Sequence, residues 1–173
     1  MSALLISEQT VAHTLTSVAS LAVASVSGAM FGGITMMVDD RVGTYAFTDP
    51  TCAEIDQAQY GSGRGPCLEA FRSGAVIVVD SLAVDRRFPE FSASAMAHGV
   101  RSTLSVPMLA GATSVGALNL YAGVEHAFGD HENQTGRLFA AQAAVVLVNA
   151  QAYWGAHLRG EQLQMALQSR EPI

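Results

Sequence analysis

The two cysteines of the chain are its best candidates for nucleophilic or redox chemistry. Cys52 and Cys67 are too few for a disulfide scaffold or for a zinc site, which needs about four ligands at short spacings. They could form one redox-switched disulfide that reshapes the glycine-rich loop from Gly61 to Pro66, if their Cα atoms lie within about 7 Å of each other. We favour the interpretation that they are two half-buried thiols, which are common in intracellular proteins.

The basic residues are all arginines, and they are few. The chain has nine basic and fifteen acidic residues, contains no lysine, and carries a formal charge of -6. A nucleic-acid-binding surface normally needs a basic stripe that neutralises phosphates, so we do not expect this chain to contact nucleic acid itself. Because 50% of its residues are hydrophobic and only 14% are charged, we expect it to bury a sizeable core and not to be disordered.

The uncharged stretch from Thr14 to Val38 is long enough to span a bilayer, which takes about 20 residues. Serines and threonines dilute it, however, and Gly28, Gly32 and Gly33 interrupt it where a helical pattern changes to a strand pattern. No arginine precedes Arg41, so the basic flank of a signal peptide or membrane anchor is missing. The sequence therefore predicts a cytoplasmic protein with no membrane partner.

Hydrophobic periodicity and turn residues predict the elements that position these side chains. Asp49 and Pro50 supply an acceptor and a pre-set residue for the start of a helix, and Asp130 is the predicted N-cap of the last helix. The predicted helices are Ser7–Ser25, Thr51–Ala58, one from Pro66 to the stop at Gly74, Pro89–His98 and Asp130–Arg170, and the predicted strands are Ala29–Asp39, Val42–Thr48, Ala75–Val79, Thr103–Leu109 and Ser114–Tyr121.

This order indicates an α+β fold with one antiparallel sheet of five or six strands. The short helices would cover one face of the sheet, and the N- and C-terminal helices would cover the other. Residues 1–27 would form the N-terminal helix on a dimerisation side, 28–152 the domain core, and 153–173 a helical extension beyond the core. A homodimer through both terminal helices is the expected assembly.

The last helix is predicted from apolar residues at steps of three and four. It would be roughly 60 Å long at ~1.5 Å per residue, so part of it must extend past a domain of this size. Gly155 and Gly160 mark where it would most easily bend. The stripe comprises Leu138, Ala141, Val145, Val148 and Ala152, and Leu158, Leu163 and Leu167 continue as a weak seam for a partner helix.

Five motifs, read in order, resemble a GAF domain over about Val11 to Gln151. They are Gly63-Arg64-Gly65-Pro66-Cys67-Leu68-Glu69-Ala70, Val78-Val79-Asp80, Asp85-Arg86-Arg87-Phe88-Pro89-Glu90-Phe91, Gly99-Val100-Arg101-Ser102 with Leu104-Ser105-Val106-Pro107, and Gly116-Ala117-Leu118-Asn119-Leu120-Tyr121. More narrowly, they resemble GAF domains of actinobacterial regulators with a C-terminal ANTAR domain, the RNA-binding module of antiterminators. The segment from Leu163 to Arg170 is similar to the linker before that module.

The resemblance implies a small-molecule pocket between the sheet and the short helices. Cyclic-nucleotide-binding GAF domains carry an Asn-Lys-Phe-Asp-Glu signature, which a chain without lysine cannot have. Bilin-binding GAF domains usually attach the chromophore through a cysteine followed by histidine, whereas Ala53 and Leu68 follow the cysteines here. Haem would need an axial histidine, for which only His98 lies near the expected pocket, and a histidine at a helix end commonly caps carbonyls instead.

The free methionine sulfoxide reductases, which are GAF proteins, offer an enzymatic alternative. Their Gly-Arg-Gly-x-Cys loop is matched by Gly63 to Cys67, but they also need a nucleophilic cysteine in the segment that is here Phe91 to Arg101. That segment has none, and without a thiolate the sulfoxide has no nucleophile. We therefore expect no catalytic residue and no metal.

Two arginines are expected near the pocket mouth, and we favour a role for them in tying loops together over a role in ligand contact. Arg64 or Arg101 could grip a carboxylate or phosphate through its fork of donors, or both could tie loops together by pairing with Glu69, Asp80 or Asp85. The candidate ligand-binding residues are Arg64, Cys67, Phe91, His98 and Arg101, and the candidate redox pair is Cys52 and Cys67.

The sequence predicts a non-enzymatic sensory domain that detects an unknown small molecule, with no cofactor identified. Its homodimer would pass a pocket event along the terminal helices to an RNA-binding ANTAR domain outside this sequence, in a transcription-antitermination regulator. Two alternatives stay open. One is a cysteine redox sensor, or a relative of the reductases that lacks their nucleophile. The other is a purely structural dimerisation module whose pocket its own side chains fill.

Overall fold

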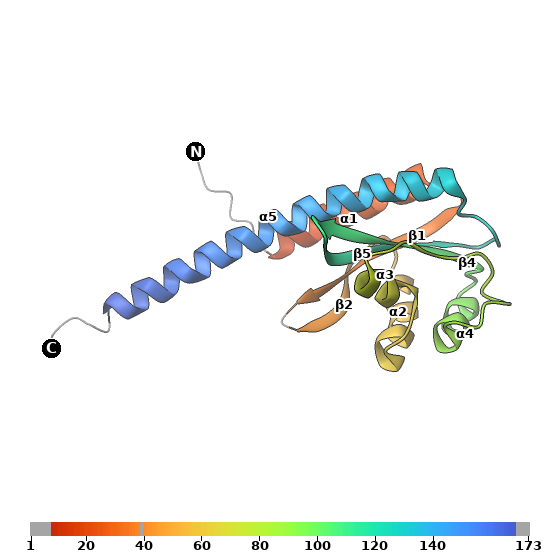
Figure 1. Ribbon diagram of the computed structural model, residues 1–173, viewed down its shortest axis with the longest axis horizontal. Coiled ribbons are helices and arrows are strands. Elements are labelled where there is room, and N and C mark those ends of the chain that lie inside the picture. The colour runs from red at the N-terminus through yellow and green to blue at the C-terminus, as the bar shows by residue number, and fades with distance from the viewer. Residues whose placement is uncertain (1–7, 39, 169–173) are drawn as a thin grey trace.

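The computed structural model describes residues 8–38 and 40–168 of the chain. This part contains five helices and five strands (Figure 1), and the strands form one antiparallel sheet with the order β2-β1-β5-β4-β3. The elements are α1 (Glu8–Ser25), β1 (Ala29–Val38), β2 (Arg41–Phe47), α2 (Thr51–Ser62), α3 (Pro66–Ser73), β3 (Ile77–Val79), α4 (Pro89–Ala97), β4 (Ser102–Ala110), β5 (Thr113–Ala122) and α5 (Asp130–Gln168). The predicted α+β fold is confirmed.

The sheet separates two layers of helices. Figure 1 shows α1 and α5 side by side on one face of the sheet and α2, α3 and α4 on the other. Strand alternation explains how one sheet serves both layers, because successive side chains point to opposite faces. On β5, Leu118 and Leu120 belong to the cluster under the terminal helices, whereas Tyr121 packs with the cluster under the short helices.

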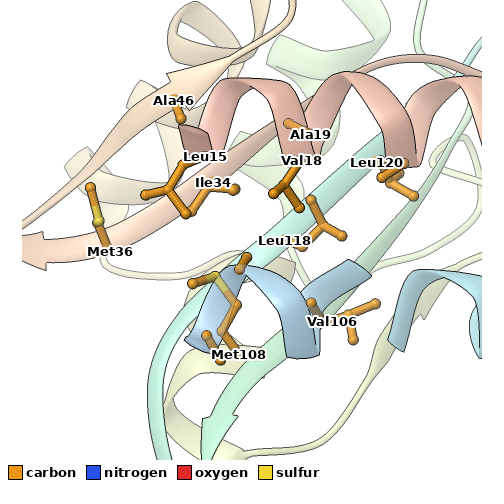
Figure 2. Close-up of a cluster of buried hydrophobic side chains, with 14 of the residues drawn as sticks. Leu15, Val18, Ala19, Ile34, Met36, Ala46, Val106, Met108, Leu118 and Leu120 are labelled. Carbon is orange, nitrogen blue, oxygen red and sulfur yellow. The ribbon is translucent and has the colours of Figure 1, made fainter. Parts of the chain in front are cut away.

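The larger core lies between the sheet and the terminal helices. Leu15, Val18 and Ala19 of α1 point toward Ile34 of β1 and Leu118 of β5 (Figure 2), and all five side chains are buried. Each fully buried leucine or isoleucine contributes about 1.5–3 kcal/mol relative to exposure. On α5 the buried positions are mostly alanines, which let this helix approach the sheet closely, namely Ala140, Ala143, Ala144 and Ala150 together with Leu147.

The short helix α2 is longer than the sequence predicted. It continues through Gly61 to Ser62 and ends at Gly63, whose positive φ of 72° closes the helix. The helix starts at Thr51, as predicted. Pro50 is its N-cap residue, and Asp49 Oδ1 accepts hydrogen bonds from the Thr51 amide at 2.8 Å and the Thr51 hydroxyl at 2.6 Å. The glycine-rich loop is therefore reduced to residues 63–65.

The start of α5 differs from the prediction in its capping. The helix begins at Asp130, which lies in its first turn, and the Gly129 amide donates to Glu132 Oε2 at 2.9 Å. This is one half of a capping box, with glycine in place of the usual serine or threonine. The helix continues through positions 155 and 160 without a break, and the predicted ends at Ser7, Asp39 and Arg170 lie outside the described residues.

The apolar stripe that predicted α5 lies on the outer side of this helix. Leu138 is 67% exposed and Val145 is 60% exposed, and Ala141, Val148 and Ala152 are exposed as well. The buried face is formed by a different set of residues one step round the helix. Helix α5 is therefore apolar on two faces, and the part of the chain that the structure describes covers only one of them.

Candidate functional site

A buried carboxylate is the centre of a polar network between the sheet and the short helices. Asp56 on α2 is fully buried, and it accepts hydrogen bonds from three neutral groups. The Thr44 hydroxyl of β2 donates to Asp56 Oδ2 at 2.6 Å, the Gln59 amide donates to Oδ1 at 3.1 Å, and the Tyr121 hydroxyl of β5 also donates to Oδ1. No cation is within hydrogen-bonding distance of Asp56 among the described residues.

Hydroxyl groups extend this network to one further strand, β1, and to helix α3. The Tyr60 hydroxyl lies 2.7 Å from Thr44 Oγ1 and 2.8 Å from Thr35 Oγ1 on β1. Thr35 Oγ1 in turn lies 3.5 Å from Cys67 Sγ on α3, and it accepts a hydrogen bond from the side-chain amide of Asn119 on β5 at 3.0 Å. Eight hydrogen-bonded residues thus connect three strands and two helices.

Secondary-structure geometry brings these residues together. Asp56, Gln59 and Tyr60 are at positions i, i+3 and i+4 of α2, so they share one helix face. Thr35 and Thr44 are direct cross-strand partners in the β1–β2 pair. Asn119 and Tyr121 are two residues apart on β5 and point to the same face of the sheet.

The glycine-rich loop has a packing role in this network. The Cys67 amide donates to Gln59 Oε1 at 3.0 Å, which holds the end of the loop against α2. A Cβ at Gly65 would overlap the Gln59 carboxamide, so any other residue at this position would displace Gln59. The motif from Gly63 to Cys67 therefore positions Gln59, which in turn donates to Asp56.

Burial shifts the proton affinities of the network. The pKa of Asp56 is raised from an ordinary 3.8 to about 6 by desolvation, against the lowering effect of its hydrogen bonds from Thr44, Tyr121 and Gln59. Desolvation also raises the pKa of Cys52 and of Cys67, with the nearby Asp56 adding to both shifts. Both thiols are free and buried, and they are held in the protonated form, which is a poor nucleophile.

The structure does not bring the five predicted ligand-binding residues together. Cys67 lies in the polar network, and Phe91 is buried in a separate apolar cluster with Cys52 and Val100. Arg64, His98 and Arg101 are exposed at the surface.

The surface arginines and His98 have local partners. Arg64 Nη2 donates to the Arg87 carbonyl at 3.4 Å, and Arg87, not Arg64 or Arg101, pairs with Asp85 at 2.7 Å. His98 contacts the Ser94 carbonyl at 2.8 Å and Glu54 Oε2 at 3.1 Å, and these contacts, the carbonyl first, raise the pKa of His98.

Sequence reasoning missed the residues of the network other than Cys67. Thr35 and Asn119 carried a signal, because they are polar residues in strands whose neighbouring residues are apolar. The missed residues are Thr35, Thr44, Asp56, Gln59, Tyr60, Asn119 and Tyr121.

Two surface grooves lie away from the network. One runs between β4 and α5 beside Val76, Pro107 and Arg137, and the other lies beside β3 and is bordered by Asp80, Asp85 and Glu125. Within residues 8–38 and 40–168, no group of three or more histidine, cysteine or acidic side chains could hold a metal ion. No helix in the same ranges is long and apolar enough to cross a bilayer.

Comparison with known proteins decides the family. A family model for the GAF domain matches residues 8–148, which is most of the chain. The chain belongs to the GAF domain family. GAF domains typically serve as sensors in signalling proteins, and the predicted resemblance is confirmed at this level.

Solved structures share the GAF fold at low identity. A type II free methionine-R-sulfoxide reductase from Thermoplasma acidophilum is 12% identical, with a TM-score of 0.63 over 80% of this chain and 93% of that chain. A domain of a two-component sensor histidine kinase protein from Sinorhizobium meliloti is 14% identical, with a TM-score of 0.66 over 86% and 96%. The GAF domain region of a membrane protein from Geobacter sulfurreducens is 13% identical, with a TM-score of 0.66 over 80% and 93%.

These likenesses establish the GAF fold alone, since sensors and reductases are both among them. A search of curated protein sequences finds no match.

Proposed function

We propose that this GAF domain is a non-enzymatic sensory domain that works as a homodimer through α1 and α5. Changes in its interior would be passed along α5 to an output domain. The observation that carries the proposal is the exposed apolar stripe on α5, formed by Leu138, Ala141, Val145, Val148 and Ala152.

The stripe has the character of a helix–helix interface. No charged residue occurs between Arg137 and Arg159, and the stripe is flanked by the uncharged amides of Gln142 and Asn149. Apolar side chains three and four residues apart form a continuous ridge, which a second α5 can cover by the same residues in a symmetric contact. A second copy of the chain is therefore the occupant that we propose.

The state of the thiols supports a non-enzymatic role. Cys52 and Cys67 are buried with raised pKa values, and the segment from Phe91 to Arg101 supplies no further cysteine. A sulfoxide reductase mechanism would need an accessible thiolate, which neither cysteine offers in this conformation.

The finer assignment rests on the motifs described above. Their resemblance to GAF domains of antiterminator regulators supports an RNA-binding ANTAR output that follows α5. The sensed small molecule belongs to the same proposal, whereas a redox response of Cys52 and Cys67 is the alternative to it. Arg64, His98 and Arg101 are its surface candidates for ligand contact, and Cys67 and Phe91 its interior ones.

The test is the oligomeric state of a variant with a charge in the stripe. Val145→Glu places a carboxylate at the centre of the stripe, and we expect sedimentation velocity to show a monomer where the wild type is a dimer. Val84→Glu is the matched control, because Val84 is 75% exposed and lies in the loop between β3 and α4, outside the stripe. A monomeric wild type, or a Val145→Glu protein that dimerises like the control, would overturn the proposed assembly.

A further inference from the structure

The hydrogen bonds of the polar network have a direction that one proton can reverse. An ionised Asp56 can only accept, so the Thr44 hydroxyl must donate its single hydrogen to Asp56 Oδ2. Tyr60 must then donate to Thr44, and Thr35 must donate to Tyr60. The amide of Asn119 donates to Thr35 at the far end. With Asp56 ionised, the whole chain of hydroxyls therefore points toward the carboxylate.

The geometry also selects the oxygen that would take up a proton. Asp56 Oδ1 receives two donors, Gln59 and Tyr121, whereas Oδ2 receives only Thr44. A proton on Oδ2 displaces a single donor, and that donor has another acceptor within reach. Thr44 can turn its hydrogen toward Tyr60 at 2.7 Å, while Oδ1 keeps both of its hydrogen bonds.

We infer that Asp56 Oδ2 is a proton-binding site whose occupancy reverses this hydroxyl chain and changes the hydrogen bond at Cys67. In the protonated state Asp56 donates to Thr44, Thr44 to Tyr60, and Tyr60 to Thr35. The Thr35 hydrogen then points to Cys67 Sγ, 3.5 Å away. Asn119 donates to Thr35 in both states, because the hydroxyl oxygen can accept twice. One proton is taken up from solvent and no covalent bond between heavy atoms changes.

Among the ionisable groups of the network, Asp56 is the one that titrates as the pH changes near neutrality. The ionisable groups that face it are Cys52 and Tyr60 of α2 itself, Cys67 of α3 and Tyr121 of β5, and all four have raised pKa values. Strands β1 and β2 contribute the hydroxyls of Thr35 and Thr44 to the row of hydrogen-bonded hydroxyls. Glu90 of α4, which packs against α2, and His98 directly after α4 are exposed. Thr44 and Tyr60 are half-buried, so they connect the carboxylate to solvent.

The row of hydrogen-bonded hydroxyls is placed to affect the proposed dimer interface. For this consequence the inference rests on the proposed function. Thr35 lies between Ile34 and Met36 on β1, and these two neighbours belong to the core under α1 and α5. Asn119 lies in the same way between Leu118 and Leu120 on β5. A change on one face of these strands is therefore one residue away from the packing of the terminal helices.

The test follows both ends of the chain during a pH titration of the whole protein. The carboxyl ¹³C shift of Asp56 reports its protonation, and we expect it to move with a midpoint of about pH 6. The infrared S–H stretch of Cys67, assigned by its loss in Cys67→Ala, should shift with the same midpoint as the thiol becomes an acceptor. Tyr60→Phe removes the central hydroxyl, so Asp56 should still titrate while the Cys67 band no longer follows it.

Each outcome has a defined meaning. An Asp56 shift that stays constant from pH 7.5 to pH 4.5 in the wild type overturns the proton site. A Cys67 band that still follows Asp56 in Tyr60→Phe overturns the chain. Sedimentation velocity of the wild type separates this inference from the proposed dimer. A monomeric wild type in which Asp56 and Cys67 still titrate together overturns the dimer and leaves the proton site standing.

Discussion

Burial of the Asp56 carboxylate carries an electrostatic cost. Burying a charge without a paired cation is unfavourable, and the three neutral donors around Asp56 compensate for only part of the lost hydration. The raised pKa of Asp56 records the remainder. A residue that costs stability in its charged form makes stability depend on pH in a direction that can be stated in advance.

We expect the free energy of unfolding to fall as the pH rises from 4.5 to 7.5. The pKa of Asp56 is higher in the folded protein, about 6, than its ordinary 3.8, so the folded state binds the proton more tightly. The stability that this group contributes is complete below pH 4 and is lost as the pH rises through 6. At about 1.4 kcal/mol per pKa unit the full loss is on the order of 3 kcal/mol, of which about 2 kcal/mol falls between pH 4.5 and pH 7.5, and urea denaturation at several pH values measures it.

Asp56→Asn should remove most of this pH dependence, since its amide does not titrate. His98 must be separated from Asp56, because the raised pKa of His98 acts in the same direction over the same range. His98→Gln provides that control, and it should retain the larger part of the effect because His98 is exposed. Equal pH slopes for Asp56→Asn and the wild type would contradict the assignment.

The network residues were hard to predict from the sequence for a physical reason. Thr35, Thr44 and Tyr60 are ordinary residues of strands and helices, and only the register of three strands brings their hydroxyls into contact. The motif residues Arg64 and Arg101 were conspicuous in the sequence, but they lie at the surface. Residue type and spacing indicated where polar chemistry could occur but not which side chains would meet.

At the level of elements, the sequence predicted types well and ends less well. Each predicted helix and strand exists, since the apolar periods of two and 3.6 residues are clear along the chain. The end of α2 was missed because Gly61 and Ser62 resemble a loop. Ser62 instead returns its hydroxyl to the Ala58 carbonyl at 2.7 Å, and Gly61 has open space around it. The local hydrogen bond of Ser62 and the left-handed conformation of Gly63 therefore set the end of α2.

The start of α5 gives a prediction at this scale. Glu132→Ala removes the acceptor of the Gly129 amide, and we expect it to destabilise the protein by about 0.5–2 kcal/mol, as loss of a helix cap does. The matched variant Glu132→Gln keeps an acceptor oxygen and should lose less. Chemical denaturation of both variants measures the difference. Equal stability of Glu132→Ala and the wild type would show that the cap contributes nothing.

The single sheet of the described residues has two faces that pack against different side chains. Its face toward α1 and α5 is packed with aliphatic side chains, and its opposite face carries the polar network beside an apolar cluster. The sequence predicted which helices cover which face, and that arrangement is visible in Figure 1. It did not predict that α5 is apolar on two sides, because periodicity alone cannot tell a stripe that faces the core from one that faces outward.

The uncharged character of the outer stripe predicts how the dimer responds to salt. Since no charged residue occurs between Arg137 and Arg159, ion pairs along this part of α5 cannot hold the two copies together. We expect the dissociation constant of the dimer to change by less than about threefold between 50 mM and 500 mM NaCl, because apolar contacts are not screened. Sedimentation equilibrium at both salt concentrations measures it. A tenfold weakening at high salt would indicate an electrostatic interface elsewhere.

The length of α5 has a geometric consequence for any domain that follows it. The helix is unbroken over 39 residues and extends well past the sheet in Figure 1, so its far end keeps a fixed angular phase relative to the strands. Each residue inserted into the extending part turns that end by about 100°, whereas seven residues return it to within about 20° of its starting direction. The helix therefore sets a rotational register as well as a distance.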